Sequence, residues 1–118
     1  MNFTKTALFT VAALTSIGAS ADQQGNAVTV ERGSKIYYTY CVSCHGISGE
    51  GDGRRAAKLE ARPTDLGKTK SPAAAIEAMI RWGGESMGRS RSMPPWEDEL
   101  SNENIKDVIS FLNSLKKS

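Results

Sequence analysis

Cysteine, histidine and aromatic residues are all scarce in this sequence. The 118 residues include two cysteines and one histidine, so the four Cys/His ligands of a structural zinc site are not available. Aromatic residues make up 7% of the chain, and a domain of this size buries only a modest core. No convincing strand, internal repeat or low-complexity tract is present. The formal charge is only +2 and the basic residues are not interleaved with aromatics, so nucleic acid is not the expected partner.

Both cysteines and the histidine lie within five residues, Cys41-Val42-Ser43-Cys44-His45. On a helix, each residue rotates the direction of its side chain by about 100°, so offsets of 0, +3 and +4 project from one side. Two thiols followed directly by an imidazole form the C-x-x-C-H signal, in which the thiols add to the vinyl groups of a haem and the imidazole binds its iron. We therefore predict that the rest of the chain surrounds one covalently held haem.

Two other interpretations of this motif remain open. A C-x-x-C pair is also the redox motif of thioredoxin-like domains, but that motif belongs near a βαβ pattern and a hydrophobic parallel strand, and neither is visible here. An ordinary disulfide in a small secreted domain is the second alternative. The absence of any other cysteine or histidine in a short exported chain favours the haem interpretation.

Residues 1–21 have the pattern of a cleaved secretory signal peptide. Lys5 precedes an apolar run over residues 7–19, and small residues at alternate positions fit a signal-peptidase site before Asp22. The run is too short to span a bilayer comfortably, and polar residues follow it rather than a stop-transfer pattern. We therefore expect residues 22–118 to form one mature domain without stable membrane insertion. A retained N-terminal anchor is the alternative.

Apolar periodicity predicts a first helix from about Val30 into the motif, after a polar segment, residues 22–27, that we expect to be frayed. The stripe consists of Gly33, Ile36, Tyr37, Tyr40 and Cys44. Glycine inside a helix is unfavourable by about 1 kcal/mol relative to alanine, which is tolerable if another helix crosses there at close range. A loose first turn is the alternative explanation of Gly33.

Two further helices are predicted in the second half. The first has Ser71 as its N-cap and Pro72 at the first helical position, and it ends after about eleven residues at Gly83-Gly84. Its apolar residues are Ile76, Met79 and Ile80. The last helix is capped by Ser101, and its buried stripe consists of Ile105, Val108, Ile109, Phe111, Leu112 and Leu115.

Two loops lie between these helices. The first contains four glycines after the motif, at positions 46, 49, 51 and 53, a density that marks a turning loop. A phosphate-binding loop is the alternative, but no strand precedes it and no Gly-Lys-Ser/Thr closes it. Residues 54–60 are expected to form a short helical turn before Pro63. The second loop, residues 84–100, is long for a small domain, and such loops usually carry function.

The iron needs a sixth ligand, and the methionines are the available donors because no second histidine exists. Met79 lies on the apolar face of a predicted helix, where core filling explains it better. Met93 precedes Pro94-Pro95, which stiffens the backbone and extends it at Met93. Met87 has nothing to fix it. We therefore predict Met93 as the ligand; Met87 and an open or water-occupied position are the alternatives.

Taken together, these motifs resemble a small bacterial class I c-type cytochrome. The similarity extends from about Val30 to Leu115 and rests on Cys41-Val42-Ser43-Cys44-His45-Gly46, Gly49-Glu50-Gly51-Asp52-Gly53, Pro63 with Asp65-Leu66, Met93-Pro94-Pro95-Trp96, and the final amphipathic helix. The resemblance implies an all-α cytochrome c fold, with about three main helices and loops surrounding one covalent haem c. The first and last helices would cross, with Gly33 at the close approach and the rings of Tyr37 and Phe111 around it.

The resemblance also implies roles for individual residues. Cys41 and Cys44 would form the thioethers, His45 would be the proximal iron ligand and Met93 the distal one. The carbonyl of Pro63 is the candidate acceptor for the imidazole N–H, although a simple helix breaker is the alternative. Other expected contributions to the haem environment are Arg81 and Trp82 near the propionates, with core packing as the alternative for Trp82, and Trp96 as a pocket wall.

Histidine and methionine ligands raise the reduction potential relative to two imidazoles, and two occupied axial positions leave no site for a substrate. The sequence therefore predicts an exported, periplasmic and monomeric carrier of single electrons between a donor and an acceptor protein, and not an enzyme. A haem subunit of a periplasmic dehydrogenase or reductase complex is the first alternative, and a ligand-binding or peroxidase-like haem protein is the second. Charge is uneven, with a local balance of +4 over residues 54–70 and −4 over residues 97–107, which can orient an encounter with a partner. Solvated faces without a partner are the alternative.

Overall fold

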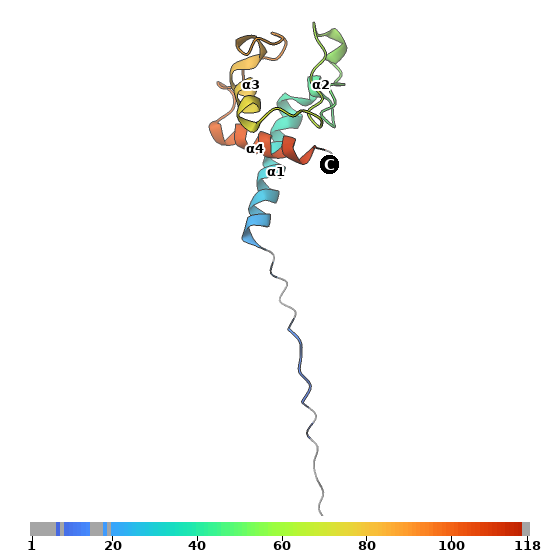
Figure 1. Cartoon of the computed structure of the whole chain (residues 1–118), viewed down its shortest axis with the longest axis vertical. Helices are drawn as coiled ribbons and strands as arrows, with labels where there is room; N and C mark the ends of the chain where they lie inside the picture. Colours follow the sequence, from blue (N-terminus) through green and yellow to red (C-terminus); the bar gives the residue numbers. More distant parts are fainter. Residues whose placement is uncertain (1–6, 8, 15–17, 19, 117–118) are drawn as a thin grey trace, which may run out of the picture.

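The structure is a computed structural model that describes residues 7, 9–14, 18 and 20–116 (Figure 1). Across these residues it contains four α-helices, one 3₁₀ turn and no strand. The elements are α1 (Ala21–Tyr40), α2 (Val42–His45), η1 (Ala56–Lys58), α3 (Ala73–Ser86) and α4 (Asn102–Ser114). The all-α fold expected from the sequence, with three long helices, is therefore confirmed.

The expected signal peptide contributes little to this fold. Residues 9–14 have no regular secondary structure, and in Figure 1 they lie away from the helical body. The apolar side chains of Phe9 and Leu14 are 92% and 96% exposed. Lys5 and Ala19 lie outside the described residues, so the signal peptide and its cleavage site remain predictions.

Helices α1 and α4 cross at Gly33, as the resemblance implied. A Cβ atom on Gly33 would overlap the backbone carbonyl of Asp107, so only glycine permits the two backbones to approach this closely. Beside the crossing, the rings of Tyr37 and Phe111 lie with their centroids 5.1 Å apart. Arg32 on α1 donates two hydrogen bonds to the buried carboxylate of Asp107, at 2.7 and 2.9 Å. The crossing therefore combines close backbone contact, ring packing and one ion pair.

The core is formed mainly by the inner faces of α1, α3 and α4. Its buried apolar residues are Tyr37, Ile76, Ile80, Leu100, Ile105, Val108, Ile109, Phe111 and Leu112. The stripe predicted for the last helix is thus buried, apart from Leu115, which is partly buried against the core. Ser101 caps α4 as expected, because its Oγ accepts a hydrogen bond from the Asn104 backbone and its own N–H donates to Asn104 Oδ1.

Helix α1 begins earlier than expected. The prediction of a frayed segment over residues 22–27 was wrong, because the helix begins at Ala21 and residues 21–28 are exposed. Adding residues to a helix requires little free energy once a packed segment has nucleated it. The polar residues therefore extend α1 without burying a face. Residues 54–60 give only the three-residue turn η1.

Helix α3 differs from its prediction at both ends. Pro72, rather than Ser71, is the N-cap, and Ala73 is the first helical residue. Gly83 breaks the helix as expected, with φ of 77° and ψ of 171°, but one further turn follows and ends at Ser86. Within the described part of the chain, no helix has both the length and the apolar character required to cross a bilayer.

Candidate haem site

Cys41 links α1 to the short helix α2, which contains the other four motif residues. Cys41 ends α1 with φ of −112° and ψ of −34°, and α2 continues through His45. The carbonyl of Cys41 accepts hydrogen bonds from the N–H groups of Cys44 and His45, at 3.2 and 2.9 Å. This helical turn supports the prediction that the three side chains share one side. Both thiols are free and half-buried, and burial raises the pKa of Cys41 to about 12.

The glycine loop returns along the motif helix and binds its backbone. The carbonyls of three successive motif residues each accept a hydrogen bond from this loop. The bonds are Arg55 N–H to Ser43 (2.8 Å), Gly53 N–H to Cys44 (3.1 Å) and Gly51 N–H to His45 (2.9 Å). The last carbonyls of a helix have no hydrogen-bond partner within the helix. The loop therefore completes the backbone hydrogen bonding of α2. Glycine is required at position 53, because a Cβ there would overlap the backbone of Ser43.

Gly51 joins this loop to the segment that lies beside the histidine. Its φ is 76°, and a Cβ would overlap the carbonyl of Pro63. The Pro63 carbonyl therefore lies against Gly51, and the backbone group that adjoins the His45 ring belongs to the next residue, Thr64. No hydrogen bond joins Pro63 to His45 among the described residues, so the acceptor role expected for Pro63 remains a prediction.

The His45 ring has the properties of a metal ligand. Its Nδ1 atom is buried and has no hydrogen-bond partner within the described residues. Burial lowers the pKa of His45, while the nearby backbone of Thr64 acts in the opposite direction. A lowered pKa keeps the imidazole neutral, which is the form that binds metals. A buried ring nitrogen without a partner is unfavourable in a finished core, so the site fits a group that engages this ring.

The distal segment lies on the last turns of α3. The carbonyl of Met93 accepts a hydrogen bond from Gly84 N–H (2.8 Å), and Trp96 N–H donates to the Ile80 carbonyl (3.0 Å). A Cβ on Gly83 would crowd the backbone at Met93, Pro94 and Pro95, so the glycine pair admits this loop.

Met79, Met87 and Met93 differ in how far they are buried. Met93 packs against the core, whereas Met87 is 37% exposed, so the structure favours Met93 over Met87 as the ordered thioether. Met79, expected to fill the core, is only half-buried.

The other residues expected near the haem have different surroundings. Trp96 packs on Tyr40, the residue before the motif, with ring centroids 5.2 Å apart. Trp82 is 49% exposed, which excludes the alternative that it packs in the core. Arg81 donates to Glu77 Oε1 and to Asn102 Oδ1, both at 2.7 Å, and so ties α3 to the start of α4. A propionate contact by Arg81 would compete with these bonds.

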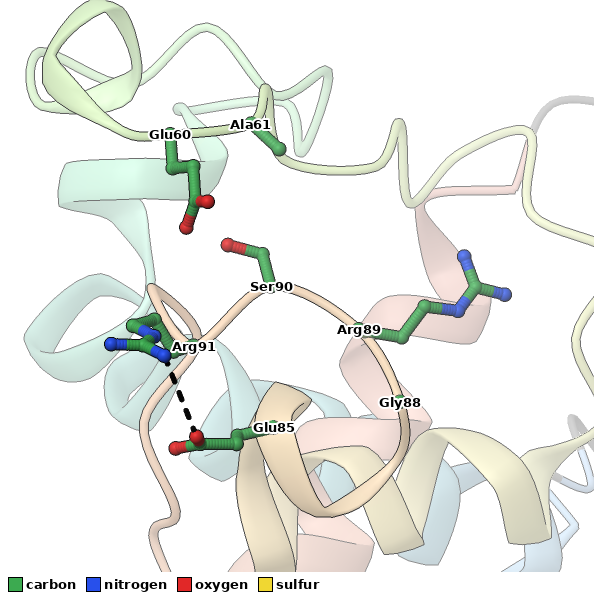
Figure 2. A pocket seen from close by; sticks show the side chains of 7 residues that line it. All are labelled: Glu60, Ala61, Glu85, Gly88, Arg89, Ser90 and Arg91. Atoms are coloured by element: carbon green, nitrogen blue, oxygen red, sulfur yellow. Dashed lines mark ion pairs between the residues drawn. The ribbon is translucent and has the colours of Figure 1, made fainter.

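A pocket of about 580 Å³ lies between the segment after η1 and the loop after α3. Figure 2 shows Glu60 and Ala61 on one side and Ser90 and Arg91 on the other, with Arg91 paired to Glu85 at 3.8 Å. Its lining contains none of the predicted iron ligands, so it marks the polar rim between the two segments rather than the ligand site. Among the described residues, no three His, Cys, Asp or Glu side chains are grouped to hold a bare metal ion.

The family profile described as Cytochrome c matches residues 30–116. The chain belongs to the cytochrome c family. Covalently bound haem c and electron transfer follow from this membership, in agreement with the sequence prediction.

Two known proteins are similar over most of this chain. The first is the cbb3-type cytochrome c oxidase subunit FixP of Bradyrhizobium diazoefficiens, with 34% identity over 85 residues, which covers 71% of this chain and 27% of FixP. The second is a chain of the Kuenenia stuttgartiensis reducing HAO-like protein complex Kustc0457/Kustc0458, with a TM-score of 0.63 and 27% identity, which covers 76% of this chain and 44% of that chain. This cytochrome c chain thus spans about a quarter of FixP and less than half of the Kuenenia chain.

The sequence did not predict the hydrogen bond and the backbone contact that hold the motif in place. The hydrogen bond from Tyr37 to Gly46 and the position of Thr64 beside His45 were not predicted. A tyrosine inside an otherwise apolar stripe was the available signal for the first, because a buried phenol usually finds a hydrogen-bond partner. No comparable signal existed for a backbone group.

Proposed function

We propose that this protein is an exported monohaem cytochrome c that carries single electrons between periplasmic redox proteins. Cys41 and Cys44 would hold a porphyrin through thioethers, and His45 and Met93 would bind its iron. The bound haem supplies an iron that changes oxidation state by one electron. The buried, unpaired Nδ1 of His45 beside two free thiols is the observation that carries this proposal.

The chain's own residues have three tasks in this proposal. The loop that binds the α2 carbonyls holds the backbone that carries the thiols and the imidazole, which would limit rearrangement when a bound iron changes charge. The backbone beside His45 orients its ring and raises its basicity. The Met93 segment, bound to α3 through Gly84 and Ile80, would cover a bound haem and keep water from it.

Absorption spectra of purified protein, matured in a host that attaches haem, test the ligand set. We expect a covalent haem that acidified acetone does not remove, and a thioether-to-iron charge-transfer band in the oxidised form. The Cys41→Ala/Cys44→Ala double variant should release its haem into acidified acetone, while each single variant should retain one thioether. A colourless native protein, or one that loses its pigment to the solvent, would contradict the proposal.

Surface charge supports docking by other redox proteins. The residues of the basic segment are Arg54, Arg55, Lys58, Arg62, Lys68 and Lys70, and all of them are exposed. Within this segment, Lys68 forms an ion pair with Asp65 at 3.1 Å. The acidic residues Glu97, Asp98, Glu99 and Glu103 are also exposed, on the segment that follows Trp96 and at the start of α4. These opposite charges can orient two different partners, and their effect should weaken as salt increases.

A second function is an electron-transfer subunit of a larger enzyme. The similarity to chains named as an oxidase subunit and as part of a reducing HAO-like complex favours this alternative. Gel filtration of the native protein from its own membranes and periplasm distinguishes the two. A monomer that several donors reduce supports the carrier, and a stable stoichiometric complex supports the subunit.

A further inference from the structure

Tyr37 is a completely buried residue with a strong hydrogen bond next to the proposed proximal ligand. Its side chain is 0% exposed, between α1 and α4, and its hydroxyl donates to the Gly46 carbonyl at 2.6 Å. Gly46 directly follows His45 and has φ of 85°, so it sets the direction in which the chain leaves the motif. Burial raises the pKa of Tyr37 above its ordinary value of about 10, so the phenol remains a donor well above neutral pH.

Hydrogen bonds connect the Gly46 turn to the segment whose Thr64 backbone lies beside the His45 ring. Gly49 N–H also donates to the Gly46 carbonyl, at 3.2 Å, and the Gly49 carbonyl accepts from Leu66 N–H at 2.7 Å. The segment that ends at Leu66 includes Thr64, whose backbone lies beside the imidazole. The contacts therefore run from the α1/α4 crossing, through Tyr37 and the Gly46 turn, to the backbone that faces His45.

The glycine loop after the motif is also held at its far end, near Gly51. Gly51 N–H donates to the His45 carbonyl at 2.9 Å, and Arg62 Nε donates to the Gly51 carbonyl at 3.3 Å. A second nitrogen of Arg62 donates to the Glu50 carbonyl at 3.4 Å. Arg62 is exposed, and its two bonds are long, so Tyr37 makes the shorter and better protected of the two attachments.

We propose that Tyr37 is a positioning residue for the axial histidine: its hydroxyl holds the Gly46 turn so that the Thr64 backbone stays against the His45 ring and tunes the iron. The inference rests on the proposed ligation by His45. A polar backbone group that faces the ring raises the basicity of a ligating imidazole and so stabilises ferric iron. Loss of the Tyr37 hydroxyl should loosen this group and shift the equilibrium toward the ferrous form.

The chain offers a matched pair of variants. Tyr37→Phe removes one buried hydroxyl and keeps the ring that packs on Phe111. Tyr38→Phe, at the next residue, removes a hydroxyl that donates to the Ile47 carbonyl at 3.3 Å from a side chain that is 47% exposed. Each variant loses one tyrosine hydroxyl bonded to a loop carbonyl, but only the first hydroxyl is buried behind the motif.

Each purified holoprotein is equilibrated with a redox dye of known potential, and the reduced fraction is read from the absorption spectrum. We expect Tyr37→Phe to change the equilibrium constant for reduction about threefold in favour of the ferrous form, and Tyr38→Phe to leave it unchanged. The haem methyl resonances of the oxidised protein should also move in Tyr37→Phe, because their spread depends on the orientation of the axial ring. Arg62→Gln, which weakens the second attachment, should shift the equilibrium in the same direction by less.

Equal potentials and equal methyl spectra in the native protein and Tyr37→Phe would overturn the inference. A shift of equal size in Tyr38→Phe would do so as well. If Tyr37→Phe yields no holoprotein, an unchanged potential in Arg62→Gln overturns the inference and a ferrous-directed shift supports it. Failure of the proposed function looks different, because the native protein itself would then lack covalent haem or thioether ligation.

Discussion

The two segments that carry the proposed iron ligands differ in how firmly the protein holds them. On the proximal side, the motif helix has the carbonyls of Ser43, Cys44 and His45 bound by the returning loop, and the fully buried Tyr37 lies behind it. On the distal side, Met93 accepts one short bond from Gly84, and its own N–H donates at 3.3 Å to Ser90. Residues 85–89, which precede it, are exposed.

The difference shows that more backbone hydrogen bonds hold the proposed proximal ligand than hold the proposed distal ligand, which follows an exposed turn. Local opening starts where backbone bonds are few and exposure is high. The proximal side should therefore tolerate little change, while the distal ligand should be removable without loss of the fold. The following predictions test this contrast from the largest effect to the smallest.

Gly51→Ala should have the largest effect, because it disrupts the proximal loop at a crowded point with a positive φ. The added Cβ would overlap the Pro63 carbonyl, and alanine is strained at a φ of 76°. Together these effects should lower the free energy of unfolding by about 3 to 5 kcal/mol. Urea unfolding of the holoprotein, followed by circular dichroism, measures the change.

Gly88→Ala in the distal loop is the matched control. Its φ of 67° is similarly positive, but no atom lies within 4 Å of the added Cβ. Only the backbone strain remains, so the loss should be about 1 to 2 kcal/mol. Equal losses in the two variants would contradict the contrast between the crowded turn at Gly51 and the open turn at Gly88.

Met93→Leu should convert the protein from one that excludes small ligands into one that binds them. Leucine has a similar volume and can pack against the core, but it has no thioether. The reduced protein should then bind carbon monoxide readily at neutral pH and lose the thioether charge-transfer band, while its unfolding free energy changes by about 1 kcal/mol or less. Its potential should also fall.

Met87→Leu provides the comparison, since Met87 lies six residues earlier and is 37% exposed. It should leave carbon monoxide binding and the spectrum unchanged. Ready binding of carbon monoxide by the native protein would show that the distal position is already open, and the ligand-binding alternative would then replace the carrier.

The same contrast explains how much the sequence could predict. The proximal motif is local, with three reactive residues within five positions, so its chemistry was readable directly. The choice of Met93 rests on its neighbours Pro94 and Pro95, which restrict the backbone whatever the tertiary context, and it stays a prediction. The caps at Ser101 and near Pro72 were also local, and they were correct to within one residue.

What the sequence did not predict depends on contacts between distant segments. The start of α1 at Ala21 was missed because burial, the signal used for helices, is absent from residues 21–28. The positions of Thr64 beside His45 and of Tyr40 against Trp96 require the loops to fold back, and no periodicity encodes that. The bond from Arg81 to Asn102 depends on how α3 meets α4, while the propionate contact expected for Arg81 stays a prediction.

Alkaline pH should give the smallest effect and extend the contrast. Burial raises the pKa of Tyr37 above the usual value of about 10, so the folded chain keeps a proton that the unfolded chain releases. The free energy of unfolding should therefore fall as the pH rises above about 10, since the folded state binds more protons there. Urea unfolding at pH 9 and pH 11 measures this decrease, which should be smaller in Tyr37→Phe than in Tyr38→Phe.

The thioether band at high pH tests whether the two segments open together. If the loss of this band at high pH is the same in Tyr37→Phe as in the native protein, the distal loop opens independently of the proximal side. A band loss that follows the titration of Tyr37 would instead mean that the two segments open together, because the core behind the motif would then hold both.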